Sequence, residues 1–262
     1  MIQRVLLNVF PSLVFLFAIS IGTNAHGVDG QDKNVYEKGF GTRQGSHFFI
    51  RFEGAEHTST AELIAILLEE AYMKVGMDLG FHPIDRIAVV LYAEKSFYDI
   101  TRTPSWAGAL YDGNIKLPSG GITERTKTLE AVLFHEYTHA IVHRLSNGNS
   151  PMWLNEGIAQ HEEGKGGEEA KDLLRNMAAG GGLPALSSFE RSFMRLSEED
   201  AYLAYIVSLS ATDYLIREFG IFSVKNIFDA LGKGAGLDSA FLSAINLSYV
   251  DFEENWHRWL KR

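Results

Sequence analysis

The sequence predicts an α+β protein, in which a lobe with a small mixed β-sheet and two adjoining helices precedes an all-helical C-terminal lobe. Three observations carry this prediction. Aromatic and β-branched runs that are typical of strands lie at 46–53, 84–92 and 106–118. Two apolar runs with helical spacing, at 129–145 and from about 153, follow them. From residue 187 onward the apolar residues recur at helical spacing alone.

The composition sets bounds on size, partners and chemistry. A chain of 262 residues with 46% hydrophobic content can bury one well-packed domain or two coupled lobes. The net charge is −9 and no block of Lys or Arg stands out, which argues against a nucleic-acid partner. Cysteine is absent, which excludes a thiol nucleophile, a disulfide framework and a cysteine-ligated metal site. A metal site in this chain would use histidine and carboxylate ligands.

The N-terminus has the pattern of a targeting signal. Arg4 precedes an almost entirely apolar stretch at 5–21, and small residues up to Ala25 offer a cleavage site. We expect residues 1–25 to be removed, leaving an extracytoplasmic protein, periplasmic or secreted, with no stable membrane span. An uncleaved membrane anchor is the alternative, although the apolar stretch is near the lower limit for a spanning helix and Pro11 interrupts it.

The elements of the first lobe follow in order. Residues 26–45 are rich in Gly, Asp, Asn and Gln and predict a flexible leader. A strand is expected at 46–53, a helix at 60–77 and a buried strand at 84–92. A short helical or turn segment is expected at 96–99.

A β-hairpin is expected next. Its strands would be 106–111 and 115–118, because Asp112-Gly113 is a strong two-residue turn signal between them. Gly120 and Gly121 then end the strand region.

The helical run at 129–145 contains the segment His135-Glu136-Tyr137-Thr138-His139, and threonines before it offer N-caps. Residues four apart lie on one helix face, so both imidazoles can reach one ion. Glu136 lies about 100° around the helix from His135 and can address a water without being a ligand. Zinc-assisted hydrolysis needs this arrangement of nitrogen ligands, an open position and an adjacent general base.

A second helix beginning near Trp153 would bring Glu156 back across the first helix. Two histidines, one glutamate and a water form a known catalytic zinc set. The sequence therefore predicts Zn²⁺ held by His135, His139 and Glu156, with Glu136 as the general base.

The motif HEYTH at 135–139, followed by WLNEGIA at 153–159, resembles the gluzincin clan of zinc metallopeptidases. Within the clan the chain is most similar to the peptidase MA-like domain. The resemblance extends from about residue 46 to 259 and includes the segments 106–113 and 204–220.

This resemblance implies a zincin-like catalytic lobe at 46–179 and a helical lobe at 180–262, with a cleft between them. It implies zinc-dependent hydrolysis of a peptide or protein substrate. It also makes Ala107, Gly108 and Ala109 the candidate edge strand that binds extended peptide by strand addition. The alternative is an ordinary hairpin whose Trp106 packs in the core.

The resemblance also suggests supporting residues. Many members of the clan carry an acidic residue at the position of Gln160, where it accepts a hydrogen bond from a zinc-bound imidazole. Gln160 could accept this bond more weakly, and Glu162 is another candidate. Asn155 is expected to brace the backbone near the site, or else to cap a helix.

The second lobe follows a linker at 180–184. Helices are expected at 188–195, 198–219, 221–230, 238–245 and 249–260. Clan members use a Tyr or His from this lobe to stabilise the developing oxyanion, and Tyr205 is the best candidate here, ahead of Tyr202 and His161. The alternative is a tyrosine that only packs in the core.

Two other classes of protein stay open at this point. One is a non-catalytic extracytoplasmic module for binding or assembly on a degenerate peptidase fold; the presence of Glu136 beside all three ligands argues against it. The other is a structural metal site that His143 or His161 closes as a fourth ligand. His143 lies one turn beyond His139, and a helix diverges from one ion over two turns.

Overall fold

The computed structural model describes residues 16–19, 39–103, 107–165 and 168–262. The predicted signal and leader therefore lie outside the described residues, apart from residues 16–19 and 39–45. None of the helices in the described part of the chain is long and apolar enough to cross a membrane.

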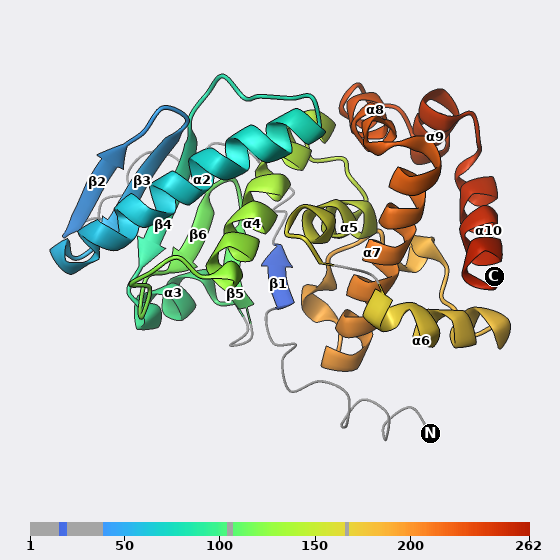
Figure 1. Ribbon diagram of the computed structural model, residues 1–262, viewed down its shortest axis with the longest axis horizontal. Helices are drawn as coiled ribbons and strands as arrows, with labels where there is room; N and C mark the ends of the chain where they lie inside the picture. The colour runs from blue at the N-terminus through green and yellow to red at the C-terminus, as the bar shows by residue number, and fades with distance from the viewer. Residues whose placement is uncertain (1–15, 20–38, 104–106, 166–167) are drawn as a thin grey trace.

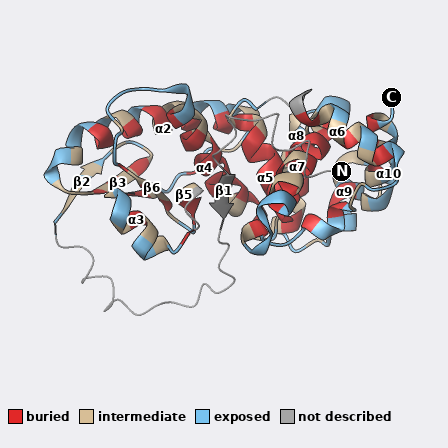
Figure 2. Cartoon of the chain, turned by 90° about the horizontal axis from the view of Figure 1, so that it is seen from below, coloured by how far each residue is buried: buried red, intermediate tan, exposed pale blue. Residues whose placement is uncertain are grey.

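The first part of the protein is a mixed sheet with helices on both faces (Figures 1 and 2). Helices α2 (Thr58–Asp78) and α4 (Lys127–Ser146) cover one face, and α3 (Glu94–Thr101) covers the other. Among the described residues the strand order is β1-β5-β6-β4-β3-β2. The strands are β1 (Leu16–Ile19), β2 (Phe40–Gln44), β3 (Phe48–Glu53), β4 (Ile87–Tyr92), β5 (Ala107–Tyr111) and β6 (Ile115–Pro118).

The strand pattern follows from which faces are covered. Phe48, Ile50 and Phe52 of β3 are buried, and the residues between them are partly exposed. Five of the six residues of β4 are buried, because helices lie on both faces of this central strand. The β5–β6 hairpin forms as predicted, with Gly113 at φ 103° in its turn.

Two strand boundaries differ from the predictions. The predicted flexible leader at 26–45 is wrong at its end, because Phe40–Gln44 pairs antiparallel with β3 as an edge strand. Backbone pairing supplies the stability there, and a polar sequence does not signal it. The buried strand begins at Ile87 and not at 84, since Ile84 is 99% exposed.

The outer side of β5 is paired in this structure. β1 runs parallel to β5, with Leu16 opposite Ala107 and Ile19 opposite Tyr111. Among the described residues, β5 is therefore not the last strand of the sheet.

Helix α4 is the predicted motif helix. It begins after Thr126, whose side chain accepts a hydrogen bond from the Leu129 backbone N–H at 3.1 Å. It ends at Asn147, which takes the left-handed conformation at φ 51°. Helix α5 (Met152–Glu162) follows after a short turn and packs across α4, as the sequence predicts.

The C-terminal part is all-helical, as predicted, with two differences. The segment predicted as a helix at 188–195 forms two short 3₁₀ turns, Leu186–Phe189 and Phe193–Arg195, and Ser192 caps the second turn. Helix α6 (Glu168–Ala179), amphipathic but flanked by glycines, was not predicted. The remaining helices are α7 (Glu198–Phe219), α8 (Ile221–Gly232), α9 (Leu237–Ile245) and α10 (Tyr249–Leu260).

One main core joins the sheet to the C-terminal helices. Its buried apolar side chains extend from Phe48 in β3 to Trp256 in α10. The close contact between α5 and α7 is at Gly157, where a Cβ atom would lie 2.0 Å from Thr212 Oγ1 and 2.4 Å from the Ser208 carbonyl oxygen. The absence of a side chain at Gly157 therefore sets how closely α5 approaches α7.

Replacing Gly157 by Ala should destabilise the protein by about 3 kcal/mol, because a backbone carbonyl of α7 must move away. Thermal unfolding measures this loss. Gly182→Ala is the matched control, since a Cβ at Gly182 meets nothing within 4 Å. Equal stability of the two variants would contradict the close approach of α5 and α7.

Candidate metal centre

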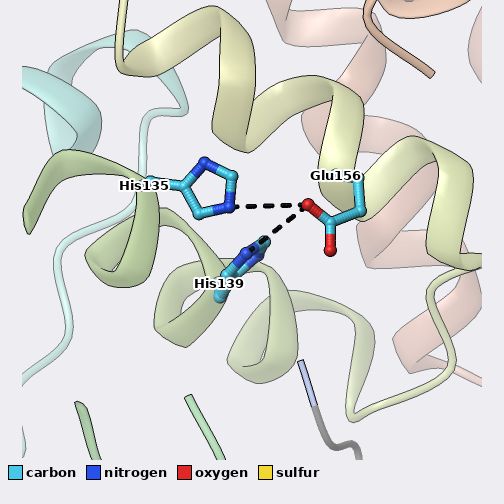
Figure 3. A group of neighbouring side chains, drawn as sticks. All are labelled: His135, His139 and Glu156. Atoms are coloured by element: carbon cyan, nitrogen blue, oxygen red, sulfur yellow. Dashed lines mark ion pairs between the residues drawn. The ribbon is translucent and has the colours of Figure 1, made fainter. Parts of the chain in front are cut away.

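Three side chains from two helices converge in the core, as Figure 3 shows. His135 and His139 extend from α4 and Glu156 from α5, and their ligand atoms lie within 4.8 Å of one another. Glu156 Oε2 lies 3.4 Å from His135 Nε2 and 3.9 Å from His139 Nε2. Nitrogen and oxygen ligands at about 2.0–2.1 Å from a tetrahedral zinc ion are about 3.3 Å apart. The separation between Glu156 and His135 matches this value and the other separations are larger, so the three side chains would close slightly around a zinc ion.

Two buried atoms of the group lack hydrogen-bond partners, which also favours a bound cation. His139 Nε2 and Glu156 Oε2 are buried and have no hydrogen-bond partner among the described residues. A buried polar atom left in this state costs about 1–3 kcal/mol, and more if it is charged. A divalent cation between these atoms would remove that cost.

The other nitrogen of each imidazole is held by a neighbour. His139 Nδ1 donates to Asn155 Oδ1 at 2.9 Å, and His135 Nδ1 donates to Glu163 Oε2 at 3.0 Å. Each bond keeps a proton on Nδ1 and turns Nε2 of the ring into the group. Asn155, predicted to brace the backbone near the site or to cap a helix, thus contacts a candidate ligand directly.

The prediction that Gln160 accepts the imidazole bond is wrong. Gln160 Nε2 donates to the carbonyl oxygens of Glu156 at 3.2 Å and Tyr205 at 3.0 Å. Glu162 is also turned away and pairs with Lys74 Nζ at 2.5 Å. The carboxylate that contacts His135 is Glu163, which was not predicted from the sequence, although its spacing of seven residues from Glu156 places both on one helix face.

Glu136 lies near the group without being part of it. Both of its carboxylate oxygens are buried and have no hydrogen-bond partner among the described residues. Burial raises the pKa of Glu136 to about 8, against the lowering effect of the charge on His135. A carboxylate whose pKa lies near neutral pH suits a general base.

The pKa values of the two imidazoles are shifted in opposite directions. Burial lowers the pKa of His135, but the carboxylates of Glu163 and Glu156 outweigh burial and raise it to about 9. Burial and the charge of His135 hold the pKa of His139 well below its usual value. His139 is thus ready to act as a neutral ligand, whereas His135 must release a proton when a metal binds.

The carboxylates around the ligands also differ from one another. Burial raises the pKa of Glu156, with the charge of His135 in partial opposition. Burial acts in the same way on Glu163, but His135 and Lys165 outweigh it and hold the pKa of this carboxyl below its usual value. Glu163 is therefore the ionised partner of His135.

Tyr205 lies in the core beside the site. It is buried in α7, and burial together with the carboxylates of Glu156 and Glu136 raises its pKa well above the usual value. Its phenol therefore stays protonated and can donate a hydrogen bond. Tyr202, one turn earlier, is partly exposed.

His143 and His161, the two candidates for a fourth ligand, are not part of the group. His161 Nδ1 is bonded to Asp213 Oδ1 at 2.9 Å, and the half-buried His143 packs edge-on against the ring of Tyr111. Within the part of the chain that the structure describes, the group that could hold a metal contains His135, His139 and Glu156 alone.

The predicted substrate strand is β5. Ala109 is fully buried and Gly108 is partly exposed. The side of β5 away from β6, which the sequence predicts as open, pairs with β1 here. Trp106, the core residue of the alternative interpretation, lies outside the described residues.

Comparison with known proteins identifies the family of the chain. A family model for the peptidase MA superfamily matches residues 68–262, which is well over half of the chain and includes the whole His135–His139–Glu156 group. No curated protein matches the chain.

Proposed function

The chain belongs to the peptidase MA superfamily, and from this membership and its buried His135–His139–Glu156 group we propose that it is a zinc-dependent peptidase. The observation that carries the proposal is the convergence of two imidazoles and one carboxylate, whose ligand atoms lie within 4.8 Å of one another, near a buried carboxylate without a hydrogen-bond partner, Glu136. A bound cation would give the buried His139 Nε2 and Glu156 Oε2 atoms the partner that the protein does not supply.

In the proposed reaction each residue has one task. His135, His139 and Glu156 would hold the zinc ion, which supplies a Lewis acid for the scissile carbonyl and lowers the pKa of water. Glu136 takes a proton from the attacking water and passes it to the leaving amine. Tyr205 donates a hydrogen bond to the oxygen that gains charge.

The proposed substrate is an extended peptide on β5. The pairing of β1 along β5 supports this, because the backbone of Ala107–Tyr111 accepts a strand on its outer side. The predicted cleavage after Ala25 would remove β1 and leave β5 as an edge. We propose that residues 1–25 direct the chain out of the cytoplasm and that the active form begins at His26.

A comparison of two forms of the chain tests this function. Zinc-loaded protein starting at His26 is expected to cleave members of a peptide library, to lose this activity with a chelator and to regain it with added zinc. The uncleaved chain should be slower, because its own segment pairs with β5. Zinc binding without cleavage of any peptide would instead favour the non-catalytic binding module.

A further inference from the structure

We propose that Glu163 is the residue that positions His135 for metal binding, in place of Gln160 one turn earlier. The inference rests on the proposed function, since it concerns the same site. It assigns to the last turn of α5 a role in setting zinc affinity.

The contact between Glu163 and His135 has the geometry for this role. Glu163 Oε2 lies 3.0 Å from His135 Nδ1, and the side chain of Glu163 is only 1% exposed. A carboxylate can only accept from that nitrogen, so a proton stays on Nδ1 and Nε2, 3.4 Å from Glu156 Oε2, is left as the atom that would bind a metal. Carboxylates in this position orient a ligating imidazole and raise its basicity.

The end of α5 holds Glu163 in place. Glu163 is the C-cap residue, and Gly164 follows in the left-handed conformation at φ 82°. The backbone N–H of Lys165 donates to the Gln160 carbonyl at 3.1 Å, and that of Gly164 to the His161 carbonyl at 3.1 Å. These two bonds form a Schellman motif, which turns the chain back over the helix end.

This turn brings a second partner to the carboxylate. Lys165 Nζ forms an ion pair with Glu163 Oε1 at 2.7 Å, although the contact lacks hydrogen-bond geometry, so a nitrogen lies beside each oxygen of Glu163. The carboxylate is thereby fixed between the candidate ligand His135 and the lysine beyond the helix end. Its orientation does not depend on the metal.

Position 160 cannot take over this task. The amide of Gln160 donates to two backbone carbonyls, one on α5 and one on α7, and so ties the two helices together. A carboxylate at the same place would face those oxygens without a proton to donate. The positioning carboxylate is therefore found three residues further along the same helix face.

The decisive measurement is zinc affinity, obtained by competition with a chromogenic chelator in the absence of any peptide. Glu163→Gln keeps the size of the side chain and should weaken zinc binding about 10- to 100-fold. It should also change the absorption spectrum of the cobalt-substituted protein, because the geometry of the His135 ligand changes.

Glu162→Gln is the matched control. Glu162 is the neighbouring buried carboxylate, but it pairs with Lys74 on α2 and does not contact the candidate ligands. This variant should leave zinc affinity unchanged.

A double variant separates the two positions. Gln160→Glu in the Glu163→Gln background should not restore zinc affinity, because position 160 faces the α7 carbonyl. Lys165→Met, which removes the outer partner of Glu163, should weaken zinc binding in the same direction but by less. Lys165→Met also tests the proposal if Glu163→Gln fails to fold.

Zinc affinity equal to that of the unaltered protein in both Glu163→Gln and Lys165→Met, or its recovery in the double variant, would overturn the role of Glu163. These outcomes are independent of catalysis. A protein that binds zinc as described but cleaves no peptide would overturn the proposed function and leave Glu163 as the positioning residue.

Discussion

Replacing Glu136 by Gln is expected to remove peptide cleavage while zinc content stays unchanged. Glu136 lies beside the three candidate ligands but is not part of their group, so its loss should not release the metal. Its carboxylate is the only group proposed here to take the proton from water, and general-base catalysis contributes about 10²–10⁴-fold to rate. Steady-state cleavage and metal analysis of the same preparation measure both quantities.

The pH dependence of cleavage gives a second measure of Glu136. Burial raises the pKa of Glu136 to about 8, and a bound divalent cation would lower it again. Activity should therefore fall as pH decreases through a value below 8, because the base becomes protonated. The residual activity of Glu136→Gln should lack this acidic limb. Unchanged cleavage by the variant would remove Glu136 from the mechanism.

Replacing Glu156 by Gln should have the largest effect on metal binding. Glu156 is the one carboxylate among the three candidate ligands. Loss of a residue that only supports a ligand lowers metal affinity roughly 10- to 100-fold, and loss of Glu156 itself should lower zinc affinity by more. The measurement is the same chelator competition. Zinc affinity within a few-fold of the unaltered protein would contradict the ligand assignment.

The same change should stabilise the metal-free protein. Burial raises the pKa of Glu156, so the folded state favours its protonated form, and stability is lost as pH rises through that pKa. Gln removes this buried charge. The unfolding temperature of metal-free Glu156→Gln should therefore exceed that of the unaltered protein at pH 8, and the difference should shrink at pH 5. A lower unfolding temperature at pH 8 would show that Glu156 stabilises the fold without metal.

The candidate metal-binding group could be predicted from the sequence because its geometry is local. His135 and His139 lie four residues apart on one helix, and a short turn leaves Glu156 few positions other than one facing them. Both helices and the N-cap Thr126 follow from apolar spacing and capping preferences.

The surrounding residues could not be predicted in the same way. The direction of Gln160 depends on a carbonyl of α7, 45 residues away in the sequence. Because Gln160 points to that carbonyl, the carboxylate beside His135 is Glu163. Likewise Phe40–Gln44 is a strand because β3 lies beside it, which a polar sequence does not signal.

The family assignment agrees with the resemblance that HEYTH and WLNEGIA suggest, and the α+β architecture agrees with the predicted fold class. Family membership alone does not assign a reaction, because function depends on the site and not on the fold. The retained Glu136 and the positioned imidazoles are what favour an active enzyme over a binding module.

The most direct test is a structure of the zinc-loaded protein beginning at His26, supported by X-ray absorption at the zinc edge. The account predicts one ion bound by His135 Nε2, His139 Nε2 and a carboxylate oxygen of Glu156 at about 2.0–2.2 Å, with a solvent molecule in the fourth position beside Glu136. A fourth protein ligand, or Glu156 turned away from both imidazoles, would contradict it.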